Sequence, residues 1–136
     1  MTLPSLITRV RSLKGPDREV DGLIATTVGG YVLEKRGNDR KPWYYHERKY
    51  RRPTDGWGYD GLERYTASVD AVLDLIGEKL ADAEPGLTME GRSKDTQLWL
   101  AWMGTVPNEP DAFAPTPALA LLLAFLNAWN TETTHD

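Results

Sequence analysis

Residues 96–103 read Thr-Gln-Leu-Trp-Leu-Ala-Trp-Met, and they are the starting point for predicting the fold. In a β-strand, successive side chains point to opposite faces of the sheet. The even-numbered apolar residues here are Leu98, Leu100 and Trp102, and the odd-numbered ones are Trp99, Ala101 and Met103. Because both faces are apolar, we expect a strand that is covered on both sides.

The sequence around this strand predicts a second strand and four helices. Residues 87–92 form the second strand, and Ser93-Lys94-Asp95 turns the chain between the two. Helical spacing of apolar residues predicts helices over residues 3–14, 16–28, 66–82 and 116–129. A sheet that needs two covers, in a chain with four helices, indicates an α+β fold. We expect a three-layer α-β-α sandwich with a small, mostly antiparallel sheet.

The third and fourth helices have the clearest patterns. Thr66 or Ser68 can cap the third helix, and Pro85-Gly86 is expected to close it. Its predicted buried face consists of Val69, Val72, Leu73, Ile76 and Leu80. The fourth helix opens at Thr116-Pro117, and residues 118–126 are apolar on every side, so we expect this helix to be buried.

Between residues 31 and 65 the helical spacing is lost. Residues 31–33 read as a short strand and residues 37–39 as a turn, while the stretch that follows is either a second strand or an ordered loop. We therefore expect one sandwich domain over residues 16–129. Residues 1–15 would be a helical extension packed on it, and residues 130–136 a polar tail.

Length and composition exclude several functional classes. A chain of 136 residues has room for one domain, and without cysteine it can form neither disulfides nor cysteine–zinc sites. The longest apolar run covers 9 residues, at 118–126, whereas a membrane helix needs about 20. Arg9 and Arg11 precede any long apolar stretch, so no secretory signal is visible. We expect a soluble protein of the cytoplasm.

Charge is distributed unevenly along the chain. Residues 34–52 hold eight basic and three acidic residues, which leaves +5; the whole chain carries −4, so the remainder carries −9. Basic side chains neutralise phosphates, and aromatic rings stack on unpaired bases. This basic aromatic segment is the candidate binding site, with the residues Arg40, Lys41, Trp43, Tyr44, Tyr45, Arg48, Lys49, Tyr50, Arg51, Arg52 and Trp57. The alternative is an aromatic loop folded over the domain, with its cations solvated.

Motifs for catalysis are weak. Residues 56–61 match the spaced glycines of a dinucleotide-binding loop, but no strand precedes them and no helix begins within them. His46 has no visible orienting partner. Asp70, Asp74 and Glu78 repeat every four residues, which is typical of a solvated helix face and only rarely of a cation site. We expect no catalytic residues, no metal, no cofactor and no enzymatic activity.

Three segments resemble small uncharacterised phage and prophage proteins with a phage ABA sandwich domain. They are residues 18–21 leading to Val28-Gly29-Gly30, residues 65–71, and residues 116–121; related proteins place a loop containing Trp and Pro before the second segment. The resemblance spans residues 16–129 and implies α-β-α layering. It also implies an accessory protein in a bacterial cytoplasm that binds host components, including defence systems. Neither the helix over residues 3–14 nor the strong positive charge of the middle stretch is expected from the family.

Two functional hypotheses follow. In the first, the chain is a non-catalytic module that binds a host or phage protein complex, with an anti-defence role as one form of such binding. In the second, the basic aromatic segment binds nucleic acid or a nucleotide. A homodimer surface at exposed tryptophans is a further alternative, and no membrane partner is expected.

Overall fold

The computed structural model describes residues 2–35, 48–51, 62–93, 96–104 and 112–134, and these form an α+β fold. The helices are α1 (Leu3–Arg11), α2 (Arg18–Thr27), α3 (Val69–Lys79) and α4 (Pro117–Thr134). The strands are β1 (Val32–Lys35), β2 (Arg48–Arg51), β3 (Pro85–Ser93), β4 (Thr96–Met103) and β5 (Ala112–Ala114). Each predicted helix is present, and both predicted strands around residues 87–103 are confirmed.

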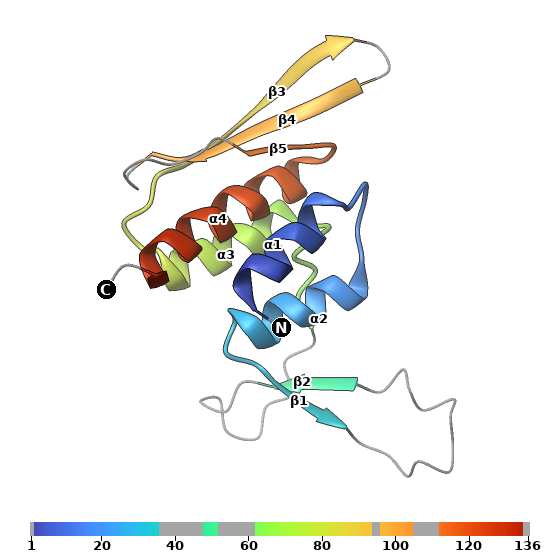
Figure 1. Cartoon of the computed structure of the whole chain (residues 1–136), viewed down its shortest axis with the longest axis vertical. Coiled ribbons are helices and arrows are strands. Elements are labelled where there is room, and N and C mark those ends of the chain that lie inside the picture. The colour runs from blue at the N-terminus through green and yellow to red at the C-terminus, as the bar shows by residue number, and fades with distance from the viewer. Residues whose placement is uncertain (1, 36–47, 52–61, 94–95, 105–111, 135–136) are drawn as a thin grey trace.

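The described elements follow one another in space along the long axis of the molecule (Figure 1). A three-stranded antiparallel sheet, in the order β3-β4-β5, lies at one end and packs against α4. On the far side of α4 lie the other helices, of which α1 and α3 contact it directly. The antiparallel β1–β2 ribbon lies beyond α2, at the opposite end.

Helix α4 is the centre of the core. All residues from 118 to 126 are buried, as the apolar run predicted, because the sheet lies on one side of the helix and α1 and α3 on the other. Thr116 caps α4 by accepting a hydrogen bond from the Leu119 N–H at 3.2 Å. Fully burying one leucine side chain stabilises a fold by roughly 1.5–3 kcal/mol, so α4 is a dominant source of stability.

The two N-terminal helices begin at side-chain caps. The Thr2 hydroxyl accepts a hydrogen bond from Ser5 N–H, and the Asp17 carboxylate accepts one from Glu19 N–H and another from Val20 N–H. Apolar residues of α1 and α2 then reach the core, namely Leu6, Ile7, Val10, Val20 and Ile24. The segment predicted as an extension is thus part of the core cluster. Gly30, with a φ of 74°, follows α2 in a backbone conformation that favours glycine.

Three details of the prediction were wrong. Leu73 does not belong to the buried face of α3: it is 41% exposed, and Leu75 is buried instead. Pro85 and Gly86 do not close α3 but begin β3, a position where proline is tolerated because it is the first residue of the strand. Helix α4 does not end at Trp129 but continues to Thr134, well into the segment expected to be a polar tail.

The strand register confirms that β4 has two apolar faces. Residues directly opposite in the sheet share a face, so Ala101 lies with Leu87 and Ala112, and Leu100 lies with Thr88 and Phe113. Ala101, Met103, Ala112 and Ala114 are buried on the face that packs on α4, the inner face. Within the described residues, a helical layer covers the inner face only. No helix in the described part of the chain has the length and apolarity to cross a membrane.

Candidate functional site

The basic aromatic segment is described only in part. Its residues Arg48, Lys49, Tyr50 and Arg51 form β2, so the alternative of a strand holds for this portion. The other predicted site residues lie outside the described residues, as do His46 and the glycine motif at 56–61. They are Arg40, Lys41, Trp43, Tyr44, Tyr45, Arg52 and Trp57.

The register of the β1–β2 ribbon brings residues of like charge together. Lys35 lies opposite Arg48, and Glu34 lies opposite Lys49. Opposite charges across a strand pair are favourable, whereas like charges directly opposite are destabilising. The register therefore pairs one position of opposite charge and one position of like charge across the ribbon.

A second surface is the outer face of the three-stranded sheet. We define the outer face by its described side chains: Thr88, Leu98, Leu100, Trp102 and Phe113. Phe113 is 47% exposed, and Leu98, Leu100 and Trp102 are each partly exposed. Four large apolar side chains on the neighbouring strands β4 and β5 thus lie on one face of the sheet, a feature typical of a binding site when it is exposed to solvent.

A glycine on the neighbouring strand leaves the space that the tryptophan ring of the outer face occupies. Gly86 lies opposite Trp102, and a Cβ atom at position 86 would overlap the indole ring. The indole therefore lies directly over the Gly86 backbone. Only glycine permits this approach, because any other side chain would push the ring away.

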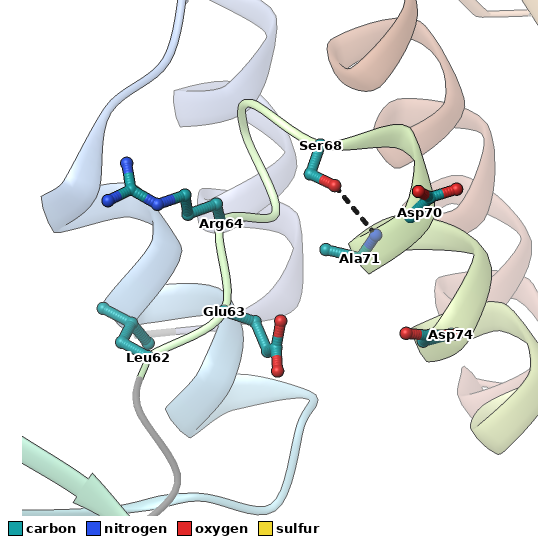
Figure 2. Close-up of a pocket in the computed structure, with 7 residues that line it drawn as sticks. All are labelled: Leu62, Glu63, Arg64, Ser68, Asp70, Ala71 and Asp74. Atoms are coloured by element: carbon teal, nitrogen blue, oxygen red, sulfur yellow. Dashed lines mark hydrogen bonds between the residues drawn. The ribbon is translucent and has the colours of Figure 1, made fainter.

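A third feature is an acidic hollow of about 460 Å³ between the segment 62–68 and the start of α3. Glu63, Asp70 and Asp74 line it, with Glu63 extending from the loop toward the helix in Figure 2. An adjoining hollow of about 280 Å³ adds Glu78 and the edges of Tyr31 and Tyr65. The Ser68 hydroxyl at the rim accepts a hydrogen bond from Ala71 N–H at 3.2 Å and so caps α3.

Three carboxylates and the cation Arg64 leave the lining of the larger hollow with a net negative charge. Asp70, Asp74 and Glu78 are exposed, as their spacing on the solvated side of α3 predicted. Over the part of the chain that the structure describes, no group of three or more acidic, histidine or cysteine side chains is placed to hold a metal ion.

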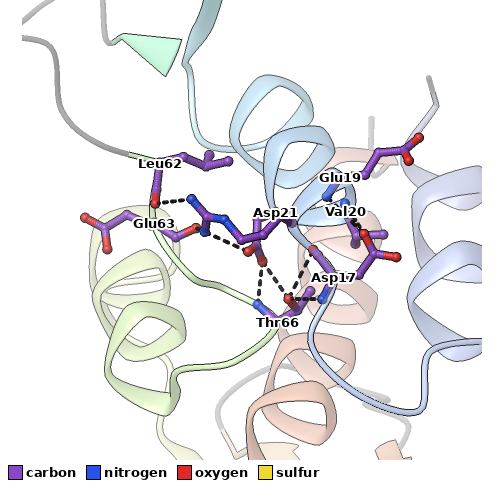
Figure 3. A network of polar contacts seen from close by, with 8 residues as sticks. Asp17, Glu19, Val20, Asp21, Leu62, Glu63 and Thr66 are labelled. Carbon is purple, nitrogen blue, oxygen red and sulfur yellow. Dashed lines mark hydrogen bonds and ion pairs between the residues drawn. The ribbon is translucent and has the colours of Figure 1, made fainter. Parts of the chain in front are cut away.

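The loop that forms one wall of the hollow is held by a buried polar network, shown in Figure 3. Asp21 of α2 is 1% exposed, and its Oδ1 accepts hydrogen bonds from both the backbone N–H and the hydroxyl of Thr66, each at 2.7 Å. Arg18 donates to Asp21 Oδ2 at 2.9 Å and to the backbone carbonyl oxygens of Leu62 and Glu63. We call Arg18, Asp21 and Thr66 the loop clamp.

Sequence reasoning missed the loop clamp. The sequence offered Thr66 and Ser68 as caps of α3, and the structure shows that Ser68 is the cap. Thr66 is instead buried against α2, where its hydroxyl also accepts a hydrogen bond from the Asp17 N–H. Asp21 and Thr66 are 45 residues apart, so no local pattern connects them.

Comparison with known proteins adds no assignment to these surfaces. No protein-family model matches the chain, and no match is found among curated proteins or among solved structures.

Proposed function

We propose that this protein is a non-catalytic module that binds a partner protein through the outer face of its sheet. The observation that carries the proposal is the exposure of Phe113, at 47%, beside the partly exposed Leu100 and Trp102. Aromatic side chains on an accessible apolar surface are typical anchors of protein interfaces.

The partner's contribution follows from the two apolar faces of β4. On the inner face, α4 buries Ala101 and Met103 completely. An apolar helix of the partner would bury Leu100 and Trp102 in the same way and would complete the three-layer α-β-α arrangement. We therefore expect the partner to present a helix with an apolar stripe rather than a charged surface.

The biological setting of the proposal depends on the resemblance to phage ABA sandwich proteins. In that setting the chain is an accessory protein of a phage or prophage in the cytoplasm of its bacterial host. Its partner would be a host or phage protein complex, and occupying a defence complex would make it an anti-defence factor.

An affinity capture from bacterial lysate tests the proposal. Tagged wild-type protein, the double variant Leu100→Ser/Phe113→Ser and the control Leu73→Ser are compared, each with and without nuclease. The control removes an exposed leucine from α3, away from the sheet. The captured protein is then purified and its Kd measured against all three.

We expect a discrete protein that survives nuclease and binds the wild type and the control alike. Its affinity for the double variant should fall by about 30-fold or more, since truncating interface anchors costs about 2 kcal/mol or more. Equal binding by the double variant would refute the proposal. So would enzymatic turnover abolished by substituting a single carboxylate.

A second candidate function is the binding of a polyanion at the β1–β2 ribbon, and the register of Lys35 opposite Arg48 favours it. Fluorescence anisotropy with labelled 20-nucleotide single- and double-stranded DNA, over a range of salt concentrations, tests this function. Replacing Arg48, Lys49, Arg51 and Arg52 with alanine should weaken binding and flatten its salt dependence. The control replaces four cations elsewhere, namely Arg9, Arg11, Lys14 and Lys79. Binding that responds equally to both sets, or ignores salt, would exclude the ribbon as the site.

A further inference from the structure

Over the described residues, strand β3 lies at the edge of its sheet. In the described part of the chain its only strand neighbour is β4, and β3 is nine residues long, whereas strands at sheet edges are commonly kept short. Native edges are also protected by lysine, proline or bulges. Here Pro85 protects one end and a register irregularity between Gly91 and Ser93 the other, but residues 86–89 carry neither charge nor proline.

The same edge exposes a large apolar side chain. Met89 is 53% exposed although it lies on the inner face, opposite Trp99. Leu87, two residues earlier on the same face, is only partly buried. An unpaired edge that carries an exposed apolar residue is a template for the addition of another strand.

A second copy of β3 can pair with this edge. When two copies of one strand pair antiparallel in a continuous sheet, a two-fold axis perpendicular to the sheet relates them. Directly opposite residues must lie on the same face of the sheet. The axis therefore lies midway between the two copies of one residue, and not at the level of the peptide bond between two residues.

A central Thr88 gives favourable pairs over residues 87–89, while the outer pairs, Gly86 with Glu90 and Pro85 with Gly91, add backbone pairing alone. An axis at Leu87 would confine the pairing to residues 85–89 of the strand. With the axis at Thr88, the two Thr88 residues lie opposite each other, and Leu87 of each copy lies opposite Met89 of the other. Thr–Thr pairs and apolar pairs are both favourable across strands. An axis at Glu90 would instead place two carboxylates opposite each other, and an axis at Met89 would place Thr88 opposite Glu90.

We propose that β3 pairs antiparallel with β3 of a second copy about a two-fold axis at Thr88, which joins two three-stranded sheets into one of six strands. The pairing extends over residues 85–91 of each copy, where β3 is regular. The axis keeps both α4 helices on the same side of the joined sheet, so both outer faces stay open. The dimer is therefore independent of the proposed binding function.

A charge-swap experiment on the full chain tests both the pairing and its register. Thr88 is exposed, so Thr88→Glu and Thr88→Lys should fold as the wild type does, which circular dichroism and the Tm check. Sedimentation equilibrium at about 1–500 µM measures mass, because interfaces of this modest size are often weak. Phe113→Glu, at the opposite edge of the sheet, is the control.

We expect the wild type and the control to reach twice the monomer mass of 15.3 kDa. Each Thr88 variant alone should dissociate about 100-fold more readily, because like charges then lie opposite each other at the axis. An equimolar mixture of the two variants should restore the dimer. A monomeric wild type, a dimer unaffected by either variant, or a mixture that stays monomeric would each overturn the proposal; a monomeric wild type would instead leave the edge to a strand from another protein.

Discussion

Both faces of the three-stranded sheet carry apolar side chains, but a helix covers only one of them in the described part of the chain. On the inner face, Ala101 and Met103 are fully buried under α4. On the outer face, Leu100 and Trp102 alternate with them along the same strand, and Phe113 beside them is 47% exposed. The comparison teaches that the apolar pattern of a strand specifies which residues avoid water, but not which molecule covers them.

The two faces of the sheet also contribute to different properties, the inner face to stability and the outer face to the binding of a partner. Burial on the inner face is already achieved within one chain, so it contributes to the free energy of unfolding. The remaining apolar area on the outer face contributes free energy only when something binds there. Substitutions on the inner face should therefore mainly lower the free energy of unfolding. Substitutions on the outer face should mainly weaken the binding of a partner.

The largest expected effect is the destabilisation caused by a charge under α4. Met103→Asp places an unpaired carboxylate at a fully buried position and should reduce the free energy of unfolding by about 3–5 kcal/mol. Leu100→Asp, on the partly exposed outer face, should cost only about 1 kcal/mol. Urea denaturation measures both values. Equal losses would show that the outer face is as well covered as the inner one.

A somewhat smaller effect is expected on the helical side of α4, where the loop clamp joins α2 to the segment leading into α3. Asp21→Ala leaves the Thr66 N–H and hydroxyl without their carboxylate acceptor and should cost about 2–4 kcal/mol. Arg18→Ala is the matched change: it removes the cation beside the buried carboxylate, but the Arg18 side chain is 49% exposed, so water can replace part of its contacts and the cost should be smaller, about 1–2 kcal/mol. Thermal unfolding compares them; if Arg18→Ala is the more damaging, the buried carboxylate is not the centre of the clamp.

A moderate effect is expected from a single methyl group on the outer face. Gly86→Ala should displace the Trp102 indole and cost about 1–3 kcal/mol, with a shift in tryptophan fluorescence. Gly77→Ala makes the same change on α3, where nothing lies within 4 Å of the added Cβ. It should stabilise the protein by about 0.5–1 kcal/mol, because alanine is the better helix former. If both variants are stabilised, the indole does not lie over Gly86 in solution.

The sequence predicted the elements well because their patterns are local. Helical spacing located α1 to α4, and two-residue alternation located β4 and assigned its residues to two faces. The loop clamp was not predictable, since it joins a carboxylate on one helix to a threonine 45 residues away. For the predicted binding segment, local pattern left a strand and an ordered loop as alternatives, and it could not show that β1 would pair with residues 48–51 and place Lys35 opposite Arg48.

Helix α3 shows why a correct helix can still be given the wrong buried face. Apolar residues occur at positions 69, 71, 72, 73, 75, 76 and 80, so two overlapping stripes share Val72 and Ile76. One stripe includes Leu73 and the other Leu75, and both satisfy helical spacing. The position of α4 decides between them, and α4 is distant in the sequence.

The smallest expected effect tests this choice and extends the comparison of faces from the sheet to a helix. Leu73→Ser should change the free energy of unfolding by no more than about 0.5 kcal/mol, because Leu73 is 41% exposed. Leu75→Ser, two residues away, removes a buried side chain and should cost about 2–5 kcal/mol. Urea denaturation of the two variants separates them, and a loss above about 1 kcal/mol for Leu73→Ser would mean that something covers this side of α3. A change near zero for Leu73→Ser would show that the exposure of a leucine, rather than its hydrophobicity alone, determines how much its replacement destabilises α3. The same reasoning applies to Leu100 on the outer face before a partner binds.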